Sequence, residues 1–242
     1  MSGKYPSLSP YVYCTDNPMR CVDPNGEKVV IVGDDTEMYS EEKAIAAFDR
    51  MQQGTNLHLH RDDNGNVSIV GGKIMNDNDQ KLYDAINNAE VTAKIIISSE
   101  MPDPDSEDGQ IETTAGHCYG ANYYETNNTS VATNYVNIAG LNNLELPGAE
   151  GSGMIHEVTE AFEIGKISWN SRSNIQPAYR NPMPMVNGMT YTIYSPDYGV
   201  YKICHSRATP DPAKMTNQEA SCYKSPEPQN CLPKFVPKLF FK

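Results

Sequence analysis

The stretch from Gly151 to Gly165 groups side chains of the kinds that bind metal ions. His156 is followed directly by Glu157, and Glu160 stands one helical turn after His156. This is a variant of the HExxH helix, in which two side chains one turn apart bind zinc and the intervening glutamate accepts a proton from the bound water. We therefore expect His156 and Glu160 to bind zinc and Glu157 to act as general base.

The stretch must be helical for this chemistry, and its apolar residues repeat at the helical period. That apolar face consists of Met154, Ile155, Val158, Ala161 and Phe162. Ser152 is predicted to cap the start of the helix, and Gly165 is predicted to end it. On a helical wheel His156, Glu160 and Glu163 lie opposite the apolar face, with Glu157 at the edge of that group.

Two questions about this helix stay open at the level of sequence. Glu163 shares the stripe with Glu160 and can replace it as the metal ligand. The alternative to a metal site is a surface helix whose glutamates are simply solvated, because a single HExxE motif is a weak signal.

A third ligand has to come from elsewhere in the chain, and His205 is our candidate. Residues 200–208 are predicted to form a short helix stopped by Pro210. His205 is the only histidine after the proposed zinc helix, and catalytic zinc sites use three protein ligands plus water. Tyr201, one turn earlier, is a candidate for stabilising the oxyanion. The alternative is that Tyr201 only packs in the core.

A rival enzyme hypothesis uses Cys118 as the nucleophile. His117 or His156 would be its base, and Gly116 and Gly120 would loosen the surrounding loop. His117 is adjacent to Cys118 in sequence, and adjacent side chains rarely face each other.

Composition excludes several classes of function. The formal net charge of −12 argues against a nucleic-acid surface, which needs a basic stripe. No apolar run of about eighteen residues occurs, so we expect no membrane span. No charged, apolar and small-residue series opens the chain, so we expect no signal peptide. The cysteines are scattered, and Cys222 and Cys231 are either free thiols or a disulfide across a proline-rich loop.

The remaining periodicities predict an α+β fold with a small mixed or antiparallel sheet and three to four helices. The length of 242 residues suits one domain of roughly 150–220 residues plus a small appendage. Alternation predicts strands at 28–33, 91–98 and 130–139, and a hairpin that pairs 57–60 with 67–70. Helices are predicted at 40–53, 77–89, 151–165 and 200–208, and an acidic loop at 101–110. His58 and His60 are expected on the exposed face of the hairpin.

The first 27 residues are turn-rich and resemble a known family. Ser9-Pro10-Tyr11, Asn17-Pro18 and Asp23-Pro24-Asn25-Gly26 closely resemble the end of the core repeat region of Rhs (YD-repeat) proteins. In those proteins the motif marks the junction before a variable C-terminal toxin. This sequence departs from the pattern at Asp16, where the family usually has asparagine. The resemblance implies a junction peptide at 1–27, a toxin domain at 28–242, export as the tip of a larger Rhs protein, and a dedicated immunity protein as partner.

A second resemblance concerns the domain itself. The order from Ala44-Ile45-Ala46-Ala47-Phe48 through the hairpin to the segments 154–162 and 205–210 is similar to a toxin domain of Rhs-type proteins that is identified as a zincin-like metallopeptidase. The resemblance implies a zinc-dependent hydrolase, a peptidase acting on a protein or peptide substrate in competition between bacteria. The alternative from a different class is a binding module without enzymatic activity, such as a receptor-engaging tip.

Overall fold

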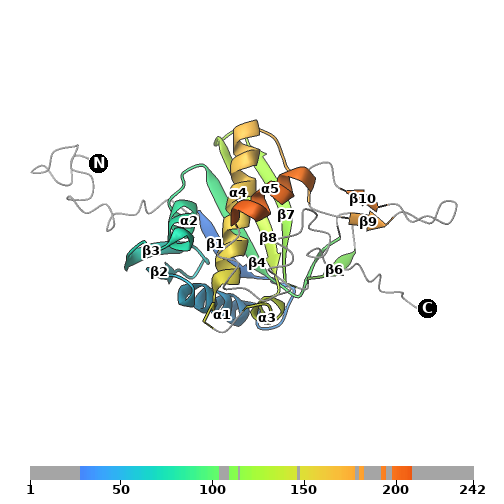
Figure 1. Ribbon diagram of the computed structural model, residues 1–242. Helices are drawn as coiled ribbons and strands as arrows, with labels where there is room; N and C mark the ends of the chain where they lie inside the picture. The colour runs from blue at the N-terminus through green and yellow to red at the C-terminus, as the bar shows by residue number, and fades with distance from the viewer. Residues whose placement is uncertain are drawn as a thin grey trace, which may run out of the picture.

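The computed structural model describes residues 28–103, 109–113, 115–145, 148–177, 180–182, 192–194 and 198–208 (Figure 1). The predicted junction peptide 1–27, Pro210, Cys222 and Cys231 lie outside the described residues. The described part is an α+β fold built on a mixed four-stranded sheet, as predicted. It contains five helices rather than three or four, because the predicted strand 130–139 ends at Val136 and the short helix α3 (Ile138–Asn142) follows.

The central sheet has the strand order β1-β4-β8-β7. Strands β1 (Val29–Gly33), β4 (Val91–Ile97) and β8 (Thr129–Val136) are parallel, and β7 (Gly116–Tyr124) runs antiparallel to β8 at the edge. In β4 and β8 every second residue is buried, which is the pattern expected when helices cover one face of the sheet. Helices α1 (Ser40–Gln53) and α4 (Ser152–Ser171) pack against these strands and against each other.

The hairpin formed by β2 (Leu57–Arg61) and β3 (Val67–Gly72) has the predicted pairing. His58 and His60 are exposed on it, as expected. Helix α2 (Asp77–Ile86) ends before the predicted Ala89. The buried Asp79 at its start accepts hydrogen bonds from Thr55 and from the backbone of Asn56 and Met75. Asp79 thereby ties the hairpin to α2.

Two predictions about irregular segments were wrong. The residues around Cys118 form the edge strand β7, and not a loop. Gly120 lies at an irregularity in β7 with φ +99°, where a Cβ atom would come within 2.4 Å of the Ile175 carbonyl oxygen. The acidic stretch 101–110 includes parts of the short pair β5 (Glu100–Pro102) and β6 (Gln110–Glu112). The strands β9 (Arg180–Pro182) and β10 (Thr192–Tyr194) form another small antiparallel pair.

Helix α4 lies at the centre of the molecule and differs from its prediction at both ends. Its N-cap is Gly151, with φ 83°, and Ser152 is already helical. Gly165 does not end the helix, which continues to Ser171. A Cβ atom at Gly165 would lie 2.4 Å from Cγ1 of Val91, so this glycine allows α4 to approach β4 closely. The prediction mistook a packing glycine for a capping glycine.

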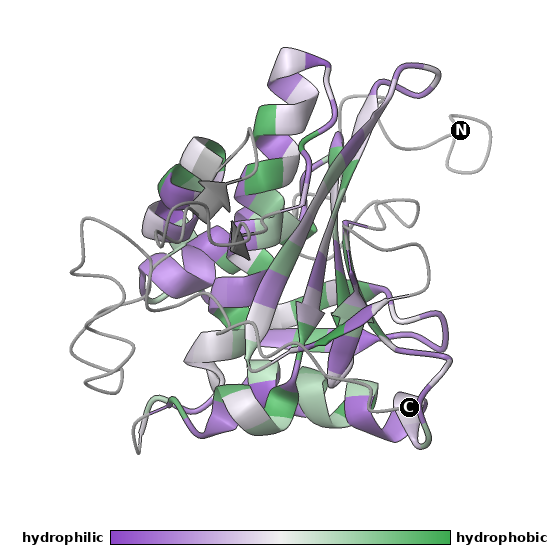
Figure 2. Ribbon diagram, turned by 90° about the vertical axis from the view of Figure 1, so that its right-hand side faces the viewer, coloured by the Kyte–Doolittle hydropathy of each residue, from purple (hydrophilic) through white to green (hydrophobic). Residues whose placement is uncertain are grey.

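Both the apolar and the polar sides of α4 are buried, because the helix lies between the sheet, α2 and a further helix, α5 (Tyr198–Ala208). In Figure 1, α4 runs in front of the strands and α5 crosses it. In Figure 2 the visible side of α4 carries both hydrophobic and hydrophilic residues. No helix in the described ranges is long and apolar enough to cross a membrane.

Candidate metal centre

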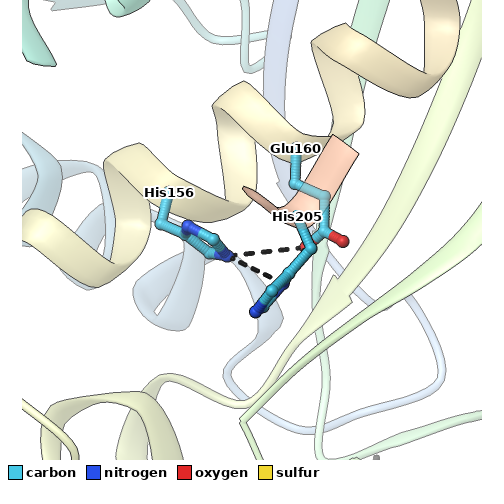
Figure 3. A group of neighbouring side chains, drawn as sticks. All are labelled: His156, Glu160 and His205. Carbon is cyan, nitrogen blue, oxygen red and sulfur yellow. Dashed lines mark hydrogen bonds and ion pairs between the residues drawn. The ribbon is translucent and has the colours of Figure 1, made fainter. Parts of the chain in front are cut away.

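Helices α4 and α5 bring together three side chains of types that can bind a metal ion. His156 and Glu160 project from neighbouring turns of α4, and His205 reaches them from α5 (Figure 3). The Nε2 atom of His156 lies 3.3 Å from Nδ1 of His205 and 3.6 Å from Oε2 of Glu160. The third side of the triangle, from His205 Nδ1 to Glu160 Oε2, is 3.5 Å. His156, Glu160 and His205 are called the triad below.

These three distances fit the coordination of one shared metal ion better than they fit hydrogen bonds. Hydrogen bonds between nitrogen and oxygen are typically about 2.9–3.0 Å long. Ligand atoms about 2.0–2.2 Å from a tetrahedral zinc ion lie about 3.4 Å from one another. Each side of the triad is close to that second value, so its three atoms match one face of a zinc tetrahedron, and the fourth corner is left for water.

The electrostatics of the triad favour the protonation states that bind metals. Burial would raise the pKa of Glu160, but His205 and His156 act more strongly and hold it well below its usual value. Burial is the main cause that lowers the pKa of His156, against the opposing influence of Glu160. An ionised carboxylate beside a neutral imidazole is the pair of forms that a cation requires. The backbone of Ala208 acts in the opposite direction to burial and raises the pKa of His156.

Glu163 has a different environment from Glu160, although both were candidates for the second ligand. Its carboxylate accepts hydrogen bonds from Lys166 at 2.8 Å and from Arg207 at 3.2 Å. The triad is formed with Glu160.

Glu157 lies on the side of α4 that faces the sheet. Its Oε2 accepts a hydrogen bond of 3.2 Å from Nδ2 of Asn134 on β8. A Cβ atom at Gly116 of β7 would lie only 2.0 Å from the Glu157 Cδ atom, so the carboxylate rests directly over that glycine. Glu157 is buried, follows a triad residue directly and is not itself part of the triad. Its role as general base stays a prediction.

Tyr201 is buried on α5, and its hydroxyl donates a hydrogen bond to the backbone carbonyl of Gln176. This bond anchors α5 to the segment that pairs with β7 through Ala121 and Ile175. The contact gives Tyr201 a structural role, and its proposed part in stabilising an oxyanion stays a prediction.

The environment of Cys118 argues against the rival nucleophile. Burial is the largest cause that raises the pKa of its thiol, and the charges of Glu160 and Glu157 raise it further. A thiol of this kind is a poor nucleophile, because the thiolate is the reactive form. Cys118 is paired with Asn134, whose side chain reaches α4, whereas His117 is the next residue along the strand and is paired with Tyr135. Alternation therefore directs His117 to the opposite face of the sheet.

Asn134 is the residue of this centre that sequence reasoning missed, and Gly116 was considered only as part of a loop around Cys118. Asn134 is separated from Glu157 in sequence, and the residues of its strand show the usual alternation of a β-strand. One local signal could have found it. Asn134 stands between Ala132 and Val136 at the alternate positions of β8 that are buried, and a polar residue is unusual at such an inward position.

Comparisons with known proteins give no further guide to this chain. No protein-family model matches it, and neither does any curated protein or any solved structure. The functional argument therefore depends on the geometry of the centre and on the residues that surround it.

Proposed function

We propose that the protein is a zinc-dependent hydrolase, with His156, Glu160 and His205 as the zinc ligands. The observation that carries this proposal is the triangle of ligand atoms, with sides of 3.3, 3.5 and 3.6 Å. Two imidazoles and one carboxylate are a ligand set of catalytic zinc sites, which leave one position open for water. The setting supports it too, since His156 and Glu160 are buried and His205 is partly buried where the three ligand atoms converge.

The neighbouring residues are assigned roles consistent with hydrolysis. A bound zinc ion would polarise the bond to be cleaved and lower the pKa of its water. Glu157 follows the ligand His156 directly, and we assign it to accept the proton from that water and to pass it on to the leaving group. Asn134 keeps the carboxylate of Glu157 in one position through the hydrogen bond between them.

The biological setting of the proposal comes from the sequence resemblance. The Rhs-like run in residues 1–27 supports a toxin that is exported as the tip of a larger protein and delivered to a competing bacterium. The zincin-like order of motifs supports a peptidase acting on a protein or peptide. A toxin of this kind needs an immunity protein in the producing cell, and an acidic chain of net charge −12 suits a basic partner.

The first test is the metal content of the purified protein, measured by inductively coupled plasma mass spectrometry. We expect close to one zinc per chain in the parent, and its loss in His156→Ala and in His205→Ala. His58→Ala is the matched control, because His58 is exposed on β2, outside the triad. A folded parent that holds no zinc after zinc is supplied would overturn the proposal and favour the binding module.

The second test concerns hydrolysis. The zinc-loaded parent and Glu157→Gln are incubated with peptides from a digested bacterial proteome, and new termini are identified by mass spectrometry. We expect cleavage by the parent and a rate lower by a factor of roughly 10²–10⁴ in Glu157→Gln, which is the usual contribution of a general base. Zinc content should be equal in both proteins. Equal cleavage rates would remove Glu157 from the mechanism.

A further inference from the structure

Asn134 occupies an unfavourable place for a polar residue. It is fully buried in β8, and on the same face of that strand its neighbours Ala132 and Val136 are also fully buried. Within the described residues its Oδ1 atom has no hydrogen-bond partner. A buried acceptor without a partner reduces stability, and an apolar residue of similar size would avoid that loss. Core packing alone therefore does not explain an asparagine at this position.

The other end of the amide makes two contacts, and both are with one residue. Nδ2 of Asn134 donates to the backbone carbonyl of Glu157 at 3.0 Å and to its carboxylate Oε2 at 3.2 Å. Both partners are acceptors, so turning the amide by 180° would set Oδ1 against two oxygens. The orientation of the amide is thus determined by its surroundings.

The edge strand completes this arrangement from the other side. Gly116 of β7 leaves the space that the Glu157 carboxylate fills, since a Cβ atom there would lie 2.0 Å from Cδ and 2.1 Å from Oε1. The carboxylate is therefore limited by Gly116 on one side and fixed by the Asn134 amide on another. Its freedom to rotate is small.

We propose that Asn134 is the positioning residue of this centre: its amide fixes the carboxylate of Glu157 in the orientation needed for proton transfer. This inference rests on the proposed function, because it takes Glu157 as the general base. Asn134 has no contact with the triad among the described hydrogen bonds, so it acts through Glu157 and not through the metal ligands.

The kinetic test uses Asn134→Leu and Asn134→Ala, which remove the N–H donors with and without filling the space. With zinc-loaded protein and a cleaved peptide from the proteome digest, we expect kcat to fall by about 10–100-fold, the usual effect of losing a supporting hydrogen bond in a metal site. KM should change little, and zinc should stay at one per chain. Ser130→Ala is the matched control, because Ser130 is equally buried on the same face of β8 and makes no side-chain hydrogen bond to Glu157 within the described residues. Full kcat in both Asn134 variants would overturn the inference.

A thermodynamic test separates this inference from the proposed function, because it needs neither zinc nor substrate. Urea unfolding of the zinc-free protein is compared for Asn134→Leu, Glu157→Leu and the double variant. Each single change removes one end of the hydrogen bond between the Asn134 amide and the Glu157 carboxylate, and the double change removes both ends. The bond from Asn134 to the backbone carbonyl of residue 157 is lost in Asn134→Leu and in the double variant alike, so it does not contribute to the coupling. We expect the unfolding equilibrium constant of the double variant to depart at least about fivefold from the product of the single effects. Multiplicative behaviour would refute the inference even in an active zinc enzyme. Strong coupling in a protein that binds no zinc would show that Asn134 holds Glu157, but it would overturn the proposed function and with it the catalytic role of that contact.

Discussion

Two glutamates one turn apart on α4 differ because of what α5 places opposite each of them. Glu160 faces His205, whereas Glu163 faces Arg207 and also pairs with Lys166. A guanidinium pairs with a carboxylate and cannot bind a cation beside it, because it is always charged and has no free lone pair. A neutral imidazole offers a lone pair, so His205 can bind a cation together with the carboxylate of Glu160.

This contrast gives a prediction with its own control. Glu160→Gln removes the one anionic ligand of the triad, and we expect the affinity for zinc to fall by at least about 100-fold, beyond the effect of changing a supporting residue. Glu163→Gln should keep zinc affinity within a few-fold and cost at most about 1 kcal/mol of stability, since Arg207 is largely exposed. Titration against a competing zinc chelator measures both. Equal loss in the two variants would contradict the assignment of ligands.

At the scale of elements, replacing a glycine in a helix has opposite effects on stability, depending on which atoms lie beside it. Gly165 is in close contact with Val91 of β4, whereas a Cβ atom at Gly199 in α5 would meet nothing within 4 Å. Alanine favours a helix over glycine by about 0.8–1 kcal/mol. A clash in a packed core costs about 1–3 kcal/mol.

We therefore expect Gly165→Ala to destabilise the protein by about 1–2 kcal/mol and Gly199→Ala to stabilise α5 by up to about 1 kcal/mol. Urea unfolding monitored by circular dichroism gives both values. Adding Val91→Ala to Gly165→Ala should recover part of the loss, because it removes the atom that a Cβ would meet. A stabilising Gly165→Ala would show that α4 can move away from the sheet.

The distinction between local signals and tertiary contacts also explains which elements could be predicted from the sequence. The bounds of α1, the hairpin and β4 follow from local periodicity and turn residues, and so they were predicted to within a residue or two. Strand β7 was missed because Gly116, Gly120 and Asn122 interrupt its tyrosines, and the strand is stabilised by pairing with β8. The triad was predictable from residue types and helical spacing. The partnership of Asn134 with Glu157 was not, because it depends on which strand faces α4.

At the scale of the whole molecule, the parallel strands β1 and β4 are joined at their carboxyl ends by one carboxylate. Glu37, in the connection between β1 and α1, accepts hydrogen bonds from the hydroxyls of Ser98 and Ser99 and from the Ser99 backbone. Lys43 of α1 pairs with it as well. Burial alone would raise the pKa of Glu37, but these hydrogen bonds outweigh burial and lower the pKa from 4.5 to about 2.

The direction of this shift determines how the fold responds to acid. A carboxylate with a lowered pKa in the folded state contributes stability above its unfolded pKa, and the contribution is lost as the pH falls toward the folded value. The window for Glu37 therefore runs from about pH 4.5 down to about pH 2. We expect Glu37→Gln to cost about 2–3 kcal/mol at pH 7, and the gap between variant and parent to shrink steadily through that window.

Urea unfolding at pH 7, 5 and 3 measures this gap, and zinc must be removed with a chelator beforehand. Any bound zinc would otherwise be released at low pH, as the proposed histidine ligands become protonated, and the added acid sensitivity would narrow the pH range in which parent and variant can both be measured. Glu42→Gln, at an exposed position of α1, is the control and should change stability by less than about 0.5 kcal/mol at pH 7. A gap that stays constant from pH 7 to pH 3 would mean that Glu37 joins the strands through packing and not through its charge.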